Sequence, residues 1–469
     1  MTDFSHNEME NKIITFGCRL NACESEIIYD FAKELGLEDI TIINTCAVTA
    51  EAERKLRQTI RKLYNENNDI KIILTGCASE LNPDSYIKMD GIVGIISNKM
   101  KLSKDEYACL KLDQITTSVV ETESTLQAQL AYPSASSKAV NGSSVTLTET
   151  KSIGVSTYAA NTETENGSTV TLALATYKGR VRGFLQVQNG CDQKCTYCVV
   201  RFTRGPSVSF PKDDIVSQTK KLLQRGYKEI VLTGVNVSSY GRSSGTGDTL
   251  SSLIRYMLKN VPDLRRLGLS SLDPADIDDE LINVISGEER LLPHIHESIQ
   301  AGDDMILKRM LRRHSAAQVV EINEKILSRR PEVVLGADMM VGFPTETDEM
   351  FENTKLLMEK AHISLLHSFP YSPRPGTPAC GMPMVEKKIR LARAAELRKL
   401  SQGLLTKKMQ EFIGKNVVIL AESEYAAKTN SFLQVKSRKK LVAGSEYLFH
   451  CEDCEKKHII GYPIEINEG

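Results

Sequence analysis

The sequence has almost no net charge and no long apolar run. Its 59 Lys and Arg residues nearly balance 60 Asp and Glu residues, which leaves a formal net charge of −1. Without an overall positive charge, any contact with nucleic acid has to come from local basic patches. No stretch reaches the roughly 18 apolar residues of a membrane-spanning helix, and residues 1–6 lack the basic and apolar regions of a secretory signal. We therefore expect a cytoplasmic protein without membrane contact.

The remaining composition is that of a soluble globular protein. The chain has 469 residues, of which 41% are hydrophobic and 25% charged. This length is enough for about two to four domains with cores of their own. Eleven cysteines in a chain without a secretory signal indicate metal binding or catalysis rather than disulfide bonds.

Three of these cysteines, Cys191, Cys195 and Cys198, lie on one short stretch with the spacing C-x3-C-x2-C. Thiolates this close together can hold one soft-metal centre, and an iron–sulfur cluster is the natural candidate. Three protein ligands would leave one iron of a four-iron cluster open to a small molecule. A zinc site or three unrelated core cysteines are the alternatives. Because zinc normally takes four ligands, usually as two C-x2-C pairs, the spacing favours the cluster.

Three more cysteines in the first hundred residues each follow an apolar run. They are Cys18, Cys46 and Cys77, just past predicted strands at 12–16, 40–43 and 70–74. Helical periodicity follows the first two strands, and such alternation predicts a parallel α/β sheet with ligands at one edge. The three cysteines would converge there as a second three-thiolate site. One such cysteine could be an ordinary buried residue, but three at equivalent positions favour a shared site.

The composition and the periodicity of the sequence change twice in the middle of the chain. Residues 116–175 are rich in Ser and Thr without stable periodicity, which predicts a flexible linker. From residue 182 to about 374, strands and helices alternate in about six units, which predicts an incomplete TIM-type barrel with functional residues at the strand carboxyl ends. The polar and glycine positions at those ends are Gly234, Asn236, Ser270, Ser271, Gln300 and Asp338.

The end of the chain predicts a small all-β module after a long basic helix at 386–412. Its size suits a small RNA-binding barrel, and the basic run at 436–440 is either a solvated turn or an RNA contact. Cys451, Cys454 and His458 have the spacing of half a zinc site. Since no fourth ligand is evident, chance spacing or a partial site is favoured over a structural zinc.

Several motifs together resemble the methylthiotransferases, a radical S-adenosylmethionine (radical SAM) family that converts C–H into C–S–CH3. The matching stretches are residues 15–21 (TFGCRLN), 44–49 (NTCAVT), 75–77 (TGC), 186–191 (QVQNGC) and 371–379 (YSPRPGTPA). The resemblance implies an N-terminal parallel α/β methylthiotransferase domain, a partial (βα)6 radical SAM core and a small all-β TRAM-like RNA-binding barrel. These would occupy residues 10–115, 176–405 and 406–469, with the linker at 116–175.

The resemblance also implies the cofactors and partners. A [4Fe-4S] cluster on Cys191, Cys195 and Cys198 would bind SAM and cleave it to a 5′-deoxyadenosyl radical. A second [4Fe-4S] cluster on Cys18, Cys46 and Cys77 would present the sulfur. The six polar and glycine positions at the strand ends become candidate SAM contacts. The implied partners are tRNA, a flavodoxin- or ferredoxin-like electron donor and a sulfur donor.

The family has branches with different targets. Residues 44–53, 300–304 and 367–372 look most like the branch that acts on N6-threonylcarbamoyladenosine at position 37 of tRNA. The alternatives are isopentenyladenosine-37 of tRNA and an aspartate of a ribosomal protein. The chain departs from the family pattern at 200–209, at Glu297, where an apolar residue is expected, and at Thr345, where Gly is expected. These departures suggest a third alternative, an inactive iron–sulfur RNA-binding protein.

Overall fold

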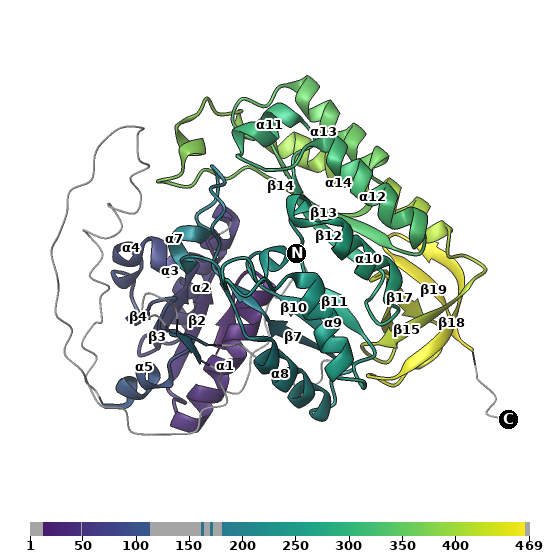
Figure 1. Cartoon of the computed structure of the whole chain (residues 1–469). Coiled ribbons are helices and arrows are strands. Elements are labelled where there is room, and N and C mark those ends of the chain that lie inside the picture. Colours follow the sequence, from purple (N-terminus) through teal and green to yellow (C-terminus); the bar gives the residue numbers. More distant parts are fainter. Residues whose placement is uncertain (1–12, 48, 113–160, 164–168, 172–180, 465–469) are drawn as a thin grey trace.

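The computed structural model describes residues 13–47, 49–112, 161–163, 169–171 and 181–464 (Figure 1). The predicted linker at 116–175 lies outside the described residues, except for two short strands. These are β5 (Asn161–Glu163) and β6 (Thr169–Thr171), which pair antiparallel.

The N-terminal part is a parallel sheet of four strands in the order β1-β2-β3-β4. Its strands are β1 (Ile13–Thr15), β2 (Ile40–Thr45), β3 (Lys71–Gly76) and β4 (Ile92–Ile96), and its helices are α1 (Arg19–Leu35), α2 (Ala50–Glu66), α3 (Cys77–Leu81), α4 (Pro83–Ile87) and α5 (Lys104–Ala108). A 3-10 turn, η1 (Cys109–Leu112), follows. Every residue of β2 is buried, which is typical of a parallel strand covered on both faces. The predicted α/β sheet is confirmed, and β4 is an additional strand.

The central part contains six parallel strands in two linked sheets. One sheet has the order β11-β10-β7 and the other β12-β13-β14. Their bounds are β7 (Arg182–Gln186), β10 (Glu229–Thr233), β11 (Leu267–Leu269), β12 (His294–Gln300), β13 (Val334–Val341) and β14 (Ile363–Pro370). Just past β11, the Leu272 amide donates to the His296 carbonyl at 2.8 Å, and the Ser298 amide donates to the Leu272 carbonyl at 2.7 Å. The two sheets therefore form one open half-barrel, which confirms the predicted incomplete barrel.

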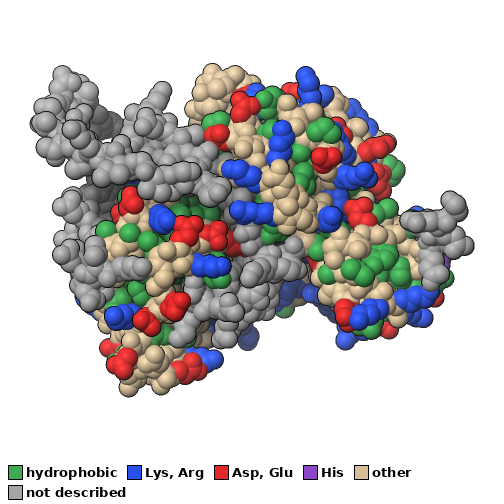
Figure 2. Space-filling model, turned by 90° about the horizontal axis from the view of Figure 1, so that it is seen from below, with side chains coloured by type: hydrophobic (Ala, Val, Ile, Leu, Met, Phe, Trp, Pro, Cys, Tyr) green, Lys and Arg blue, Asp and Glu red, His purple; other side chains and the backbone are tan. Residues whose placement is uncertain are grey.

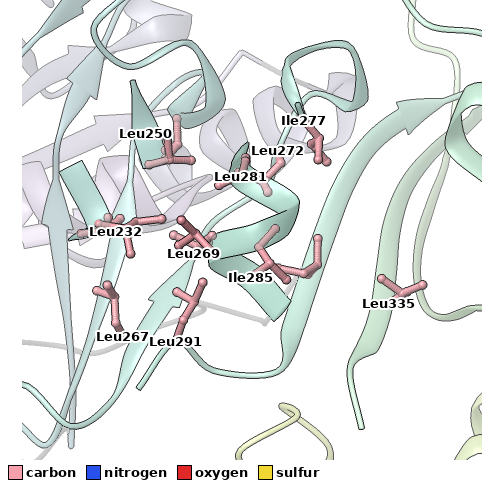
Figure 3. Packing of buried hydrophobic residues seen from close by; sticks show 14 of the residues in the cluster. Leu232, Leu250, Leu267, Leu269, Leu272, Ile277, Leu281, Ile285, Leu291 and Leu335 are labelled. Atoms are coloured by element: carbon pink, nitrogen blue, oxygen red, sulfur yellow. The ribbon is translucent and has the colours of Figure 1, made fainter. Parts of the chain in front are cut away.

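Helices cover the outer face of the half-barrel (Figure 1). They are α8 (Lys212–Gln224), α9 (Leu250–Asn260), α10 (Asp279–Gly287), α11 (Asp304–Arg309), α12 (Ala316–Arg329) and α13 (Asp348–Lys360), with 3-10 turns η2 (Val237–Ser239) and η3 (Pro274–Asp276). Leu232, Leu267 and Leu269 of the strands belong to one buried cluster with Leu250 and Leu281 of this layer (Figure 3). Each such leucine contributes about 1.5–3 kcal/mol by leaving water.

Successive residues of a strand face opposite sides of the sheet. Because the outward set is apolar, the intervening residues line the concave inner face, which we call the lumen. Phe184 of β7, His296 of β12, Asp338 of β13 and His367 of β14 are lumen residues by this alternation. The half-barrel therefore encloses a polar interior beside an apolar outer layer.

The C-terminal part is a closed five-stranded barrel in the order β15-β16-β17-β19-β18. It comprises β15 (Asn416–Ala421), β16 (Ala426–Thr429), β17 (Gln434–Ser437), β18 (Glu446–Glu455) and β19 (His458–Pro463), and follows η4 (Pro378–Gly381) and the long helix α14 (Lys387–Gln410). The barrel covers the strand amino ends of the half-barrel: Arg182 pairs with Glu422 at 2.7 Å, and His294 stacks on Phe432 at 4.7 Å between ring centroids. The predicted small all-β module is confirmed.

Candidate functional site

The first cysteine set lies on a loop between β8 (Gln188–Asn189) and α7 (Val200–Arg204), next to β9 (Val208–Ser209). Gly190 begins the loop with φ +67°, and a Cβ there would come within 1.8 Å of the Pro206 carbonyl oxygen. Only glycine fits such a position without moving the chain. The Cys191 amide then donates to the Gly205 carbonyl at 3.1 Å, which closes the loop on itself.

Each of the three loop sulfurs accepts an N–H hydrogen bond. The Gln193 amide donates to Cys191 Sγ at 3.4 Å, the Val200 amide to Cys198 Sγ at 3.5 Å, and Arg312 Nη1 to Cys195 Sγ at 3.7 Å. Such donors stabilise thiolates. Burial nevertheless raises the pKa of Cys191 to about 11 and that of Cys198 to about 12. The donor set therefore suits a positively charged soft metal, which would hold these sulfurs as thiolates.

Arg312 is a neighbour of the first cysteine set that the sequence did not reveal. It follows α11, and its Nη2 donates to the Ser298 carbonyl at 2.6 Å while the guanidinium pairs with Asp273 at 3.1 Å. These partners fix its direction toward Cys195. Its position 117 residues beyond Cys195 leaves no sequence signal except the basic run 312–314.

The second cysteine set lies at the carboxyl edge of the N-terminal sheet. Cys46 directly follows β2, Cys77 begins α3 after β3, and Cys18 precedes α1. A Cβ on Gly17 would lie 2.7 Å from Cys46 Sγ, and a Cβ on Gly76 would lie 2.4 Å from the Thr45 carbonyl oxygen. Both glycines have positive φ, +105° and +99°. The three strand ends therefore meet in close backbone contact.

A buried charged network joins the two cysteine sets. Arg204, at the end of α7, donates to Asn21 Oδ1 and Glu24 Oε1, both at 2.7 Å, and Lys101 Nζ reaches the other Glu24 oxygen at 2.5 Å. Burial opposes the charge of Arg204, but the Glu24 carboxylate outweighs it and raises the pKa of Arg204 well above its usual value. The Arg204 guanidinium is therefore a fixed positive charge beside the second set.

Asn98 is a second link between the two cysteine sets. Its Nδ2 donates to the Thr203 carbonyl at 2.8 Å and to Cys77 Sγ at 3.7 Å. Both cysteine sets thus carry polar donors of the kind that accompany cluster sulfurs. Across the described ranges, no group of three or more His, Cys, Asp or Glu side chains is arranged to hold a single metal ion. A four-iron cluster differs from such a site because each thiolate binds a separate iron.

The six candidate SAM contacts divide into three pairs. A Cβ on Gly234 would lie 2.7 Å from the Gln188 carbonyl oxygen, and the Asn236 amide donates to Gln188 Oε1 at 2.8 Å, so packing explains this pair. Ser270 Oγ and Gln300 Oε1 are buried without a hydrogen-bond partner in the described part of the chain, and Gln300 has a φ of +77°. Ser270 and Gln300 therefore have the polar atoms that a bound ligand could satisfy.

The third pair, Ser271 and Asp338, belongs to a polar cluster in the lumen. Asp338 Oδ1 lies 2.8 Å from His367 Nδ1 and 3.3 Å from His296 Nε2, and Ser271 Oγ donates to Asp338 Oδ2 at 3.5 Å. Burial would raise the pKa of Asp338, but His296 and His367 outweigh it and hold that pKa well below its usual range. The histidines come from different strands, so the sequence pattern did not connect them.

Comparison with known proteins identifies the family. The profile of the Radical SAM superfamily matches residues 185–358, and that of "Uncharacterized protein family UPF0004" matches residues 10–97. The chain is 41% identical over 438 residues to the "Threonylcarbamoyladenosine tRNA methylthiotransferase MtaB" of Rickettsia prowazekii, covering 93% of this chain and 94% of that protein. The chain belongs to the radical SAM methylthiotransferases. As a radical SAM protein it uses a [4Fe-4S] cluster and SAM.

Other members of this methylthiotransferase family are also similar. The Thermotoga maritima protein with the same MtaB name is 32% identical over 88% of this chain and 86% of its own length. The "tRNA-2-methylthio-N(6)-dimethylallyladenosine synthase" of Ehrlichia canis is 30% identical, with 88% of both chains covered. The chain is 41% identical to the first relative but only 30% identical to the Ehrlichia canis protein, and this difference favours the threonylcarbamoyladenosine branch over the dimethylallyl branch.

The three residues with the spacing of half a zinc site lie in the C-terminal barrel. Cys451 is fully buried in the core of the C-terminal barrel, while Cys454 and His458 lie on the hairpin of β18 and β19. Figure 2 shows Lys and Arg side chains mixed with acidic ones on the face it presents, in keeping with the balanced charge. None of the described helices combines the length and apolar character needed to cross a bilayer.

Proposed function

We propose that the protein methylthiolates C2 of N6-threonylcarbamoyladenosine at position 37 of tRNA. The observation that carries this proposal is the 41% identity, over nearly the whole chain, to a relative named for that activity. The structure adds two cysteine sets joined through Arg204 and Asn98. Since tRNA is the substrate, we expect the protein to act in the cytoplasm. The alternatives, isopentenyladenosine, a protein aspartate or an inactive RNA-binding protein, become outcomes of the test below.

We assign the [4Fe-4S] cluster of SAM cleavage to Cys191, Cys195 and Cys198, and a second [4Fe-4S] cluster to Cys18, Cys46 and Cys77. When bound, these groups supply the radical that removes hydrogen from C2 and the sulfur that replaces it. The residues of the chain itself position the two cysteine sets. Arg312 and the loop amides support the first thiolates, and Arg204 and Asn98 hold the two sets in register.

The remaining site residues follow from the same assignment. Ser270 and Gln300 are the better SAM contacts because their buried oxygens lack partners in the described structure. Gly234 and Asn236 support the loop through Gln188, and Ser271 and Asp338 face the substrate side of the lumen. Residues 10–115 hold the second cluster, 176–405 form the radical SAM core, and 406–469 bind RNA, with 116–175 as linker. A flavodoxin- or ferredoxin-like electron donor and a separate sulfur donor complete the reaction.

Mass spectrometry of tRNA nucleosides from cells with and without the gene tests the proposal. Loss of 2-methylthio-N6-threonylcarbamoyladenosine, with the unmethylthiolated nucleoside accumulating, is the expected result. Persistence of that nucleoside in a cell without a second copy of the gene would refute it. Loss of the 2-methylthio-isopentenyl nucleoside would indicate the other tRNA branch. Unchanged tRNA would indicate a protein target, and absence of 5′-deoxyadenosine from the reconstituted protein with reductant and SAM would indicate an inactive protein.

A further inference from the structure

Arg19 is a cation in the lumen that the first cysteine set does not use. It is the first residue of α1, directly after Cys18, and α1 runs beside β7 (Figure 1). The hydrogen bond from Cys23 Sγ to the Phe184 carbonyl at 3.6 Å ties the helix to that strand. The guanidinium carbon of Arg19 lies 5.8 Å from the Phe184 ring centroid and 5.7 Å from that of Phe432. The N-terminal domain thus places one positive charge inside the half-barrel.

In the part of the chain that the structure describes, this charge has no direct counter-ion. Arg19 donates no hydrogen bond and forms no salt bridge there, and its guanidinium lies beside the two aromatic rings. Arg182 and Glu229 act on its charge but bond to each other, and Asp338 is held by two histidines. An arginine keeps its charge in all ordinary conditions. A half-buried guanidinium with five donors and only aromatic contacts is therefore arranged for an anion that is not part of this chain.

The backbone at the amino end of α1, beside Arg19, also carries a partial positive charge. Cys18, the N-cap of α1, makes no side-chain capping bond, and the first turn of α1 contains no acidic residue. The amino end of this 17-residue helix therefore adds its partial positive charge to that of Arg19. The ligand expected here is a small planar anion that also accepts contact with aromatic rings.

The proposed substrate carries such an anion. A threonylcarbamoyl group ends in a carboxylate, whereas an isopentenyl group has no charge. Its attachment atom N6 and the reacting atom C2 flank the same edge of adenine, around N1, so the group that grips the substituent has to lie close to the cysteines that serve C2. Arg19 meets this condition because it is bonded to Cys18. We propose that Arg19 binds the carboxylate of the threonylcarbamoyl group and so selects against adenosines with a neutral N6 substituent. This inference rests on the proposed function.

Binding of anticodon stem-loop RNA to the reconstituted full-length protein tests the inference without relying on turnover. Two RNAs are compared, one with threonylcarbamoyladenosine at position 37 and one with its methyl ester, which differs only in the lost charge. The wild-type protein is expected to bind the carboxylate RNA about 30-fold more tightly, the range of a charge-assisted hydrogen bond. Arg19→Gln should reduce that ratio to about one, and Arg19→Lys should leave an intermediate ratio, since Lys keeps the charge but not the planar fork.

Arg255→Gln is the matched control, because Arg255 is an exposed arginine of α9 whose ion pair with Glu280 spans 4.0 Å. It removes the same charge outside the lumen, and the wild-type ratio should persist. A wild-type ratio near one, or an Arg19→Gln protein that keeps the wild-type ratio, would overturn the inference. If Arg19→Gln binds less iron than the wild type, Arg19→Lys decides, and a ratio equal to that of wild type would count against Arg19.

The same preparations separate this inference from the proposed function. Product analysis on the wild-type protein asks whether methylthiolated nucleoside forms at all. Formation of product with an unchanged ratio in Arg19→Gln would refute only the role of Arg19. Absence of product from threonylcarbamoyladenosine RNA, with active SAM cleavage, would refute the proposed function whatever the binding ratio.

Discussion

Cys191, Cys195 and Cys198 lie within eight residues on one loop, whereas Cys18, Cys46 and Cys77 follow three different strands. The three cysteines of the first set share one loop, which the Cys191 amide closes by donating to the Gly205 carbonyl. Arg309, Met310 and Ala379 hold the same loop through Thr196. The second set exists only when β1, β2 and β3 are in register and Gly17 and Gly76 allow their loops to touch. Damage to the sheet should therefore affect the second set long before the first.

The largest effect is expected from removing one cysteine of each set. Cys191→Ala should abolish SAM cleavage, because the first cluster would lose a ligand. Cys46→Ala should leave SAM cleavage and block methylthiolation, because only the second cluster would be lost. Assays for 5′-deoxyadenosine and for methylthiolated nucleoside, on reconstituted protein, measure the two activities. Equal loss of both activities in both variants would contradict separate roles for the two cysteine sets.

The glycines offer a second test of the comparison. Gly17→Ala introduces a Cβ 2.6 Å from Cys46 Cβ at a φ of +105°, with a cost of about 2 kcal/mol or more. We expect it to lower iron content by about half while SAM cleavage continues. Gly190→Ala is the matched variant on the other loop, where the new Cβ meets the Pro206 carbonyl oxygen, and it should remove SAM cleavage first. Iron analysis with the 5′-deoxyadenosine assay distinguishes them, and the opposite pattern would contradict a division of roles.

Glu297 allows the core to be changed without touching either cysteine set. It points from β12 toward the outer helices, is fully buried, and has two carboxylate oxygens without a hydrogen bond in the described structure. Burial raises its pKa to about 8, from 4.5, with Asn323 offsetting part of the effect. The folded state therefore holds the proton more tightly than the unfolded state, and stability falls as pH rises from about 4.5 through about 8.

We expect Glu297→Leu to stabilise the core by about 4 kcal/mol at pH 9 and by much less at pH 5. Glu297→Gln is the control, since it removes the titration and keeps the polar burial. Urea unfolding at both pH values measures the difference. Iron content of the second set should not change, and a pH-independent effect of Glu297→Leu would disprove the buried charge.

The smallest effect is expected at Thr345, a β-branched residue with a φ of +69°. This conformation costs a non-glycine residue about 1–2 kcal/mol. Thr345→Gly relieves that strain but loses the bond from Arg309 Nη1 to Thr345 Oγ1 at 2.8 Å, so the net gain should be about 0.5 kcal/mol. Thermal unfolding should show a rise of one or two degrees at most. Thr345→Ala, which keeps the strain and loses the bond, should lower the melting temperature.

Local patterns predicted most of the fold and both cysteine sets. The C-x3-C-x2-C spacing needs no tertiary information, and the strand–cysteine–helix pattern needs only the rule that parallel strands end at one edge. The short strands β16 and β19 were missed, because β16 (AAKT) has only two small apolar residues and β19 (HIIGYP) contains Gly and Pro, which are typical of turns. Arg204, Arg312 and the histidines around Asp338 were not predicted as site residues, because their partners lie on other elements, in the case of Glu24 180 residues away.

Arg204 has a consequence for the order in which the protein is made. Glu24 and Lys101 belong to the first part of the chain to be synthesised, and they can already pair with each other. Arg204, the second cation on Glu24, is added only after about a hundred further residues, together with Cys191, Cys195 and Cys198. The surroundings of the second cysteine set are therefore complete only after the loop that carries Cys191, Cys195 and Cys198 has been synthesised. Arg312, which donates to Cys195, follows about a hundred residues later still, so a nascent chain would finish the second cysteine set before the first.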